Sequence, residues 1–113
     1  MTDQADILAA QLAPYRETPG LVAALLISRD GFVVAADADP GFKTDAVAAQ
    51  VAGVIDIGAR LAAELGQPEA KYISVDFGDL NLVLAPFGSE LMLVLVGLPS
   101  ALACDYRLIR PGA

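Results

Sequence analysis

The stretch that decides the fold is LVAALLISRDGFVVAA, residues 21–36. Its first seven residues are apolar, which beside a Pro-Gly turn is typical of a strand covered on both faces. Asp30-Gly31 then separates this run from a second apolar run, Phe32 to Ala36. An Asp-Gly step between two apolar runs is the strongest short-range signal for a β-hairpin, because glycine adopts positive φ without steric cost. The stretch therefore predicts two antiparallel strands.

The residues after this hairpin predict one long helix, from Thr44 to Leu65. Gly66 and Pro68 follow it, and these residue types commonly end helices. A helix of about 21 residues, at about 1.5 Å per residue, is about 30 Å long and spans the whole domain. One wide stripe of large apolar side chains is expected to lie on the sheet. Its members are Val47, Val51, Val54, Leu61 and Leu65.

The rest of this helix has an unusually small polar surface for a helix of a soluble domain. A narrow stripe carries charge, and most of the other positions hold alanine. A row of small residues lets the backbone of a second helix approach closely, so we predict that this row contacts a second subunit. An alanine face that is simply exposed to water is the alternative. The predicted interface residues on the helix are Ala48, Ala52, Ile55, Ala59 and Ala62.

The second strand of the hairpin adds a further candidate contact. It carries Phe32 and Val34, and it is the candidate sheet edge through which two subunits join. Before the hairpin, a helix from Thr2 to Ala13 is predicted to end ahead of Pro14, since proline disfavours helix at the residue before it. A short final helix beginning at Ser100 is a further interpretation; its shared face would hold Leu102, Tyr106 and Ile109.

Three strands are predicted between the long helix and this last segment. They cover Lys71–Phe77, Leu80–Ala85 and Glu90–Val96, and Pro86 ends the middle one. The order α-β-β-α-β-β-β, with or without the final helix, predicts one α+β domain over residues 1–113. Its hairpins indicate an antiparallel sheet.

Composition excludes several classes of protein. With 56% apolar and 19% charged residues, the chain is not expected to be disordered. It contains no uninterrupted run of about 18 apolar residues, so no membrane span is predicted. A formal net charge of −7 opposes nucleic-acid binding. The chain has no His and one cysteine, Cys104, so it lacks the commonest general base, the commonest zinc ligand and any internal disulfide. The N-terminal residues lack a signal sequence, which indicates a cytoplasmic protein.

No catalytic, cofactor or metal site is predicted. The pairs Asp37/Asp39 and Asp76/Asp79 could hold a cation, but aspartate in loops and turns usually makes local hydrogen bonds. Arg29 and Arg60 are exposed cations. An arginine finger for phosphoryl transfer is the functional interpretation of such residues, whereas a solubilising charge is the simpler one. Arg60 can also pair along the helix with Asp56 or Glu64 at a spacing of four residues.

Taken together, these segments resemble the roadblock/dynein light chain family over about residues 19–97. The resemblance lies in the order of the elements and in the Asp-Gly turn. The segments that carry it are Pro19-Gly20-Leu21 leading into residues 25–35, the helix ending Glu64-Leu65-Gly66, and the strands Asn81–Pro86 and Leu91–Val96.

The resemblance implies a five-stranded antiparallel sheet with the long helix on one face and the terminal helices on the other. It implies homodimers or heterodimers formed through the central helix, with edge strands joining two sheets. Members of the family act as non-enzymatic platforms: some bind dynein intermediate chains, and many bacterial and archaeal members bind small Ras-like GTPases.

The sequence therefore predicts a cytoplasmic, non-enzymatic homodimer that docks a small Ras-like GTPase and modulates its nucleotide state. Pairing with a paralogue and a dynein-type scaffold role stay open. A small-molecule sensor domain of PAS/profilin-like architecture is the alternative from another class. It requires a pocket lined by aromatic side chains with a few convergent polar groups, and the seven aromatic residues are spread along the chain.

Overall fold

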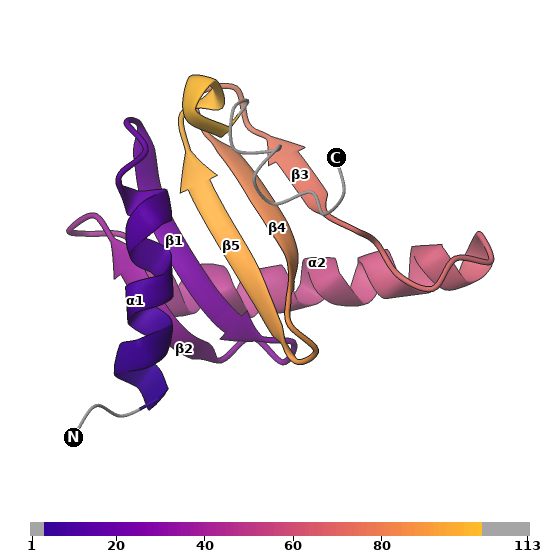
Figure 1. The fold of residues 1–113 in the computed structure, drawn as a ribbon. Helices are drawn as coiled ribbons and strands as arrows, with labels where there is room; N and C mark the ends of the chain where they lie inside the picture. Colours follow the sequence, from indigo (N-terminus) through magenta and orange to yellow (C-terminus); the bar gives the residue numbers. More distant parts are fainter. Residues whose placement is uncertain (1–3, 103–113) are drawn as a thin grey trace.

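The computed structural model describes residues 4–102 of the chain (Figure 1). Two helices and five strands lie in these residues, and a helical turn begins at residue 99. The elements are α1 (Gln4–Arg16), β1 (Leu21–Ser28), β2 (Val33–Ala38), α2 (Thr44–Glu64), β3 (Ile73–Asp76), β4 (Asn81–Phe87) and β5 (Leu91–Gly97). The predicted order of elements is confirmed.

The strands form one antiparallel sheet of five strands in the order β2-β1-β5-β4-β3. The apolar strands β1 and β5 pair at its centre, and β2 and β3 are its two edges. Figure 1 shows α1 on one face of the sheet and α2 on the other. The predicted α+β class, with a long helix on one face, is therefore confirmed.

The hairpin of β1 and β2 forms at the predicted Asp-Gly turn. Gly31 has a φ of 93°, which favours glycine, and its N–H donates to the Ser28 carbonyl over 3.0 Å. The N–H of Ser28 donates to the Phe32 carbonyl over 2.8 Å and closes the turn. The pairing of the two strands shifts between Leu26 and Ile27, so that the hairpin carries an irregularity near its end.

Each face of the sheet carries its own apolar core, because successive side chains of a strand point to opposite faces. Leu26 and Leu95 lie in the core under α1, with Leu12 of α1 and Leu102. The other core lies under α2. It contains Ala23, Leu25, Ile27, Ala48, Val51, Leu84, Met92, Val94 and Val96.

Two prolines lie inside elements that they were expected to end. Helix α1 includes Pro14 and continues to Arg16, because Tyr15 packs against the core under α1 and Arg16 bonds to the sheet. Strand β4 includes Pro86. The last pair between β4 and β3 is Leu84 with Ile73, so Pro86 lies beyond the stretch where β3 would need its N–H.

The segment after β5 also begins differently from the prediction. The helical turn starts at residue 99, and the carbonyl of Leu98, rather than Ser100, accepts the N–H groups of Ala101 and Leu102. Proline at the first helical position fits this start, since its missing N–H has no partner there. Leu102 is buried, and the expected positions of Tyr106 and Ile109 lie outside the described residues.

Candidate functional site

Helix α2 meets the sheet through Ala48 and Val51, which both lie in the core under α2. Ala48 is fully buried, and the hairpin turn comes close to the same part of the helix. A Cβ placed on Gly31 would lie 3.0 Å from the Cβ of Ala52 and 3.1 Å from the carbonyl oxygen of Ala48. The absence of a side chain at Gly31 and the small side chain of Ala52 therefore allow the two backbones to approach.

The predicted interface residues on the helix differ in exposure within their own chain. Ala48 is 0% exposed, so it is not available to a second subunit, whereas Ala62 is 6% exposed and lines a hollow beside the C-terminal half of α2. Ile55 packs against the core under α2, and Ala52 faces the hairpin. Ala59 is exposed and lines a small cavity. The sheet therefore covers part of each apolar stripe: Val51 of the large-residue stripe is also buried, whereas Ala59 of the alanine stripe is exposed.

The large side chains of the second half of α2 are exposed instead. Leu61 and Leu65, which were expected to lie on the sheet, are 57% and 65% exposed, and Ile57 is 65% exposed. Figure 1 shows the reason: α2 is longer than the sheet is wide, and its C-terminal half runs out beyond the strands. The strands that would cover these side chains do not reach them.

A groove runs along the same side of α2, between the helix and β3. We call it the α2–β3 groove. It consists of two hollows, of about 440 Å³ beside the N-terminal half of α2 and about 350 Å³ beside its C-terminal half. Val54 lines both hollows and marks their meeting point. The first is lined by Phe42, Lys43, Ala46, Val47, Gln50, Val51, Val54, Val75, Phe77, Leu80, Leu82 and Val96.

The far wall of the groove is equally apolar. Phe77 and Leu80 flank the turn between β3 and β4 and are 68% and 37% exposed. Strand β3 is an edge of the sheet, so one side of its backbone has no neighbouring strand. Contiguous exposed apolar surface of this kind typically marks a protein interaction site.

The predicted edge strand, β2, is an edge of the sheet, on the opposite side from β3. Val34 in this strand is half-buried. Phe32 precedes the strand and is 73% exposed at the hairpin turn. Helix α1 packs along β2, so this edge is flanked by the chain's own helix, whereas β3 borders the open groove.

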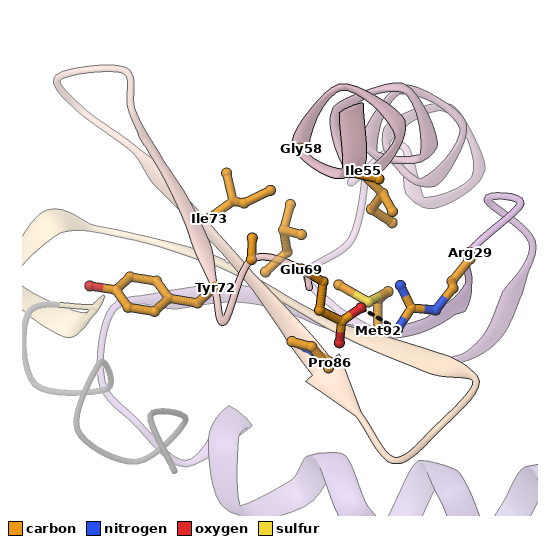
Figure 2. A pocket seen from close by; sticks show the side chains of 11 residues that line it. Arg29, Ile55, Gly58, Glu69, Tyr72, Ile73, Pro86 and Met92 are labelled. Carbon is orange, nitrogen blue, oxygen red and sulfur yellow. Dashed lines mark ion pairs between the residues drawn. The ribbon is translucent and has the colours of Figure 1, made fainter. Parts of the chain in front are cut away.

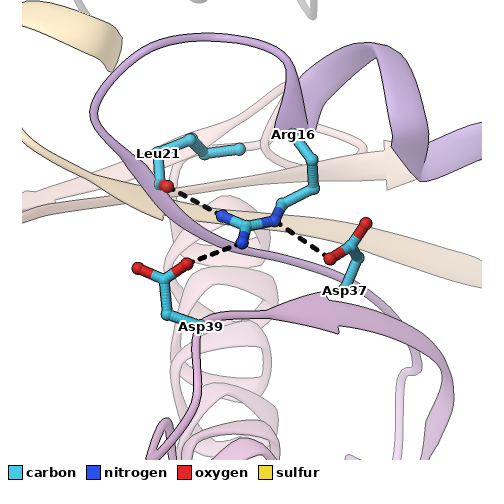
Figure 3. Close-up of polar contacts among 4 residues, drawn as sticks. All are labelled: Arg16, Leu21, Asp37 and Asp39. Carbon is cyan, nitrogen blue, oxygen red and sulfur yellow. Dashed lines mark hydrogen bonds and ion pairs between the residues drawn. The ribbon is translucent and has the colours of Figure 1, made fainter.

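The carboxylates of Asp37 and Asp39 bind an arginine of the same chain (Figure 3). Arg16 donates from Nε to Asp37 over 3.0 Å, from one terminal nitrogen to Asp39 over 2.6 Å, and from the other to the Leu21 carbonyl over 2.7 Å. The hydrogen bond to Asp39 is the main cause that raises the pKa of Arg16 above its ordinary value. This cluster fastens α1 to the sheet, so the pair is not a free cation site.

Sequence reasoning missed the role of Arg16. The signal was the single cation at the end of the first helix together with the only Asp-x-Asp pair near the end of a predicted strand. The second pair behaves as expected for a turn: Asp76 accepts the N–H of Gly78 over 2.8 Å. Arg60 pairs with Asp56 over 2.9 Å, which confirms the simpler interpretation of this residue.

A small cavity lies between α2 and the sheet on the side of the hairpin (Figure 2). Arg29 of the hairpin turn pairs with Glu69 over 3.4 Å at its mouth, beside Met92 and Ile55. Its volume is about 40 Å³, room for no more than a few water molecules. Arg29 is therefore held by an acidic partner, and the cavity is too small for a metabolite.

Two further observations concern metals and membranes. Within residues 4–102, no group of three or more acidic or cysteine side chains is placed to hold a metal ion. In the same part of the chain, α2 has the length and apolar composition of a membrane-crossing helix. Core helices of soluble proteins meet the same criterion, and Val51 of α2 is packed into the core. Most of the helix surface is nevertheless uncovered.

Comparisons with known proteins agree with this architecture. The sequence profile of the Roadblock/LC7 domain matches residues 3–97. A structure titled "MglB with tetrameric arrangement" is 24% identical over 96% of this chain and 84% of its own, with a TM-score of 0.83. The gliding protein MglB from Thermus thermophilus is 25% identical over 96% and 84%, with a TM-score of 0.82. Myxococcus xanthus MglB is 14% identical over 97% and 86%, with a TM-score of 0.81.

No curated protein sequence matches the chain. The structural likenesses describe a shared fold at low sequence identity.

Proposed function

Because this chain belongs to the Roadblock/LC7 domain family, we propose that it is a cytoplasmic, non-enzymatic adaptor that works as a homodimer. The dimer is a platform for a small Ras-like GTPase, whose nucleotide state it modulates, as the family resemblance implies for many bacterial members. The observation that carries the dimer is the α2–β3 groove with the exposed Ile57, Leu61 and Leu65 beside it.

An uncovered apolar surface of this extent needs a partner. Each fully buried leucine or isoleucine contributes about 1.5–3 kcal/mol relative to an exposed one, and three such side chains project beside one groove. A second copy offers a surface of the same kind. The contact residues of this proposal are those of the groove, which include Ala62 but not Ala48, which its own chain buries.

The dimer is tested by sedimentation velocity of the wild type and of Leu61→Glu. Leu61 is exposed, so the substitution leaves the fold of one chain intact and places a charge in the proposed contact. We expect a wild-type dimer at micromolar concentration and a monomeric variant with unchanged circular dichroism. Ala63→Glu is the matched control, because Ala63 is an exposed residue of the same helix that lines neither hollow of the groove. A monomeric wild type contradicts the proposal.

Binding of a GTPase is tested with a purified small Ras-like GTPase encoded beside this chain in its genome. The GTPase is loaded with a non-hydrolysable GTP analogue or with GDP, and binding is measured by calorimetry. We expect tighter binding of one nucleotide form and a changed rate of hydrolysis or exchange. Equal absence of binding in both forms contradicts the GTPase part of the proposal and leaves the dimer standing.

The sensor function is the second candidate because the hollow of about 440 Å³ falls within the size range of small-molecule pockets. Its lining offers only Lys43 and Gln50 as polar side chains. Mass spectrometry of the denatured protein distinguishes the two: a co-purifying metabolite at one per chain favours the sensor, and its absence together with a dimer favours the adaptor.

A further inference from the structure

We propose that the outer edge of β2 binds an extended segment of a partner protein, in which a lysine or arginine lies between two large apolar residues. The segment adds a sixth strand to the sheet, antiparallel to β2. The inference goes beyond the proposed dimer, because β2 is the edge of the sheet opposite β3 and the α2–β3 groove.

The backbone of β2 has hydrogen-bonding groups on its outer side. Within residues 4–102, β1 is the one strand that pairs with β2. The N–H of Asp39 donates to the Val22 carbonyl of β1 over 2.9 Å, so the backbone of Asp39 faces β1. Because this direction alternates along an antiparallel strand, Asp37 also faces β1, whereas Ala36 and Ala38 direct their N–H and C=O groups outward. These two residues therefore offer two donors and two acceptors to an added strand.

This part of β2 lacks the features that usually protect a sheet edge. Lysine, proline or a bulge commonly prevents an edge strand from pairing with another chain. The sequence VVAADA of β2 contains neither lysine nor proline, and the irregular pairing lies at the hairpin end of the strand. Helix α1 lies over a face of the sheet (Figure 1), whereas an added strand lies in the plane of the sheet.

The side chains of the two outward residues leave room for large apolar neighbours. Ala36 pairs with Leu25 and Ala38 pairs with Ala23, and both partners lie in the core under α2. Ala36 and Ala38 therefore point to the α2 side of the sheet, since paired residues share a face. Large apolar side chains opposite these alanines would extend the apolar surface on that side. The added strand therefore needs such residues at two positions separated by one.

The residue between them selects a cation. Asp37 points to the α1 side, where the Nε of Arg16 donates to its Oδ1, and a terminal nitrogen of Arg16 donates to Asp39 (Figure 3). One guanidinium thus serves two carboxylates, and the cluster keeps a negative charge. The side chain of Asp37 is 49% exposed.

The geometry of an added strand brings a side chain close to this charge. The residue opposite Asp37 would belong to a non-hydrogen-bonded pair, in which facing side chains are closest. A lysine or arginine there is attracted to the cluster. The net charge of −7 also favours the approach of a basic segment.

The inference is tested with the synthetic peptide acetyl-Thr-Thr-Ile-Lys-Ile-Thr-Thr-amide and the isotopically labelled full chain. Its isoleucines match the two alanines, and its lysine matches Asp37. We expect the peptide to shift the amide NMR signals of Ala36 and Ala38 and to slow their hydrogen exchange, because their N–H groups gain partners. Shifts confined to the α2–β3 groove, or no shifts at millimolar peptide, overturn the proposal.

Peptide variants test the charge selection without altering the protein. Replacing the peptide lysine by glutamate should weaken binding about tenfold at low ionic strength, because repulsion replaces attraction. Replacement by arginine should preserve binding, and the penalty of glutamate should shrink at high salt. Equal binding of the lysine and glutamate peptides overturns the proposed basic segment.

Methylation of peptide nitrogens tests the strand geometry. In the proposed pairing, the N–H groups of both isoleucines face β2, and that of the lysine faces away. Methylating an isoleucine nitrogen removes a hydrogen bond and should weaken binding about tenfold or more. Methylating the lysine nitrogen is the matched control and should change binding little. The reverse pattern overturns the proposed register.

Two further measurements separate this edge from the proposed dimer and from pairing between copies. Leu61→Glu should bind the peptide as tightly as the wild type, because Leu61 lines the groove on the other side of the molecule. A monomeric wild type that binds the peptide therefore contradicts the dimer alone. An assembly larger than a dimer that the peptide dissociates in sedimentation assigns the edge to a second copy and overturns the partner segment.

Discussion

The two helices cover the two faces of the sheet to different degrees. Under α1, the core is closed: Leu12 is fully buried, Tyr15 packs against it, and Arg16 fastens the helix end to Asp37 and Asp39. Under α2, the core is closed only where Ala48 and Val51 meet the sheet. Beyond that point, large apolar side chains of α2 are exposed beside the α2–β3 groove.

This difference shows which face of the sheet a single chain covers fully and which face it covers only in part. The same kinds of residue supply both faces, and only their distance from the strands decides whether they become core or surface. A chain of 113 residues forms only a small sheet, so a helix of 21 residues extends beyond its edge. The α1 face therefore contributes stability to the single chain, and the α2 face leaves apolar surface exposed.

The largest expected effect compares Leu12→Ala with Leu61→Ala. Leu12→Ala leaves a cavity in the closed core and should lower the free energy of unfolding by about 2–5 kcal/mol. Leu61→Ala removes an exposed side chain, so it should change the unfolding of the separate chain by no more than about 0.5 kcal/mol. Urea unfolding followed by circular dichroism, at concentrations above and below dimerisation, measures both.

The two leucines also differ in how their effects depend on protein concentration. Leu61→Ala should reduce the rise of the unfolding midpoint with concentration, because dimerisation stabilises the folded chain by mass action. Leu12→Ala should leave that rise unchanged. Equal losses of stability from both substitutions at low concentration would show that the α2 face is as closed as the α1 face.

The second prediction concerns the cluster that fastens α1. Arg16→Met keeps much of the apolar stem but removes three hydrogen bonds, and it should lower the free energy of unfolding by about 1–3 kcal/mol. Arg16→Lys should recover only part of this, since an ammonium lacks the planar fork that reaches several acceptors. Chemical unfolding measures the difference, and an unaffected Arg16→Met would mean that the apolar contacts alone hold α1.

The same cluster predicts that the contribution of Arg16 to the free energy of unfolding is constant between neutral and mildly alkaline pH. The pKa of Arg16 is raised in the folded chain, mainly by its bond to Asp39. A raised pKa adds stability that is fully present below the ordinary arginine value and is lost only as the pH rises through the folded value. Between neutral and mildly alkaline pH, the stability lost in Arg16→Met should therefore stay constant, which unfolding at several pH values checks.

The smallest expected effect compares two glycines of α2. A Cβ at Gly53 meets nothing within 4 Å, so Gly53→Ala should stabilise the separate chain by about 0.5–1 kcal/mol through helix propensity. A Cβ at Gly58 would lie 2.9 Å from Cδ1 of Ile73, and that side chain has to move. Gly58→Ala should therefore gain less than Gly53→Ala. Thermal unfolding of both variants measures the difference, and an equal gain would mean that Ile73 yields freely.

Much of the fold could be predicted from local sequence signals. The Asp-Gly turn of the hairpin appears where expected, and α2 ends next to Gly66, which has a positive φ of 70°. These features depend on residues close together in the chain, where glycine and proline restrict the backbone directly. The alternation of the third strand is also confirmed, with Ile73 half-buried and Ser74 exposed.

The errors at the first helix and on α2 involve contacts between distant residues. Pro14 was expected to end the first helix, but the bonds of Arg16 to Asp37 and Asp39, more than 20 residues away, extend it. The alanine stripe was assigned to a partner, but Ala48 is fully buried in its own chain. The spacing of apolar residues reveals that a helix has two apolar stripes, and it carries no information on which residues of each stripe the sheet covers.

The amino-acid sequence by itself determined the order of helices and strands, the turns, the acidic charge and the excess of apolar residues, because each follows from residue type and short-range spacing. Only the tertiary structure decided which apolar residues stay exposed. That outcome depends on how far the strands extend beneath α2, a distance set by the packing of the whole sheet and absent from any local pattern.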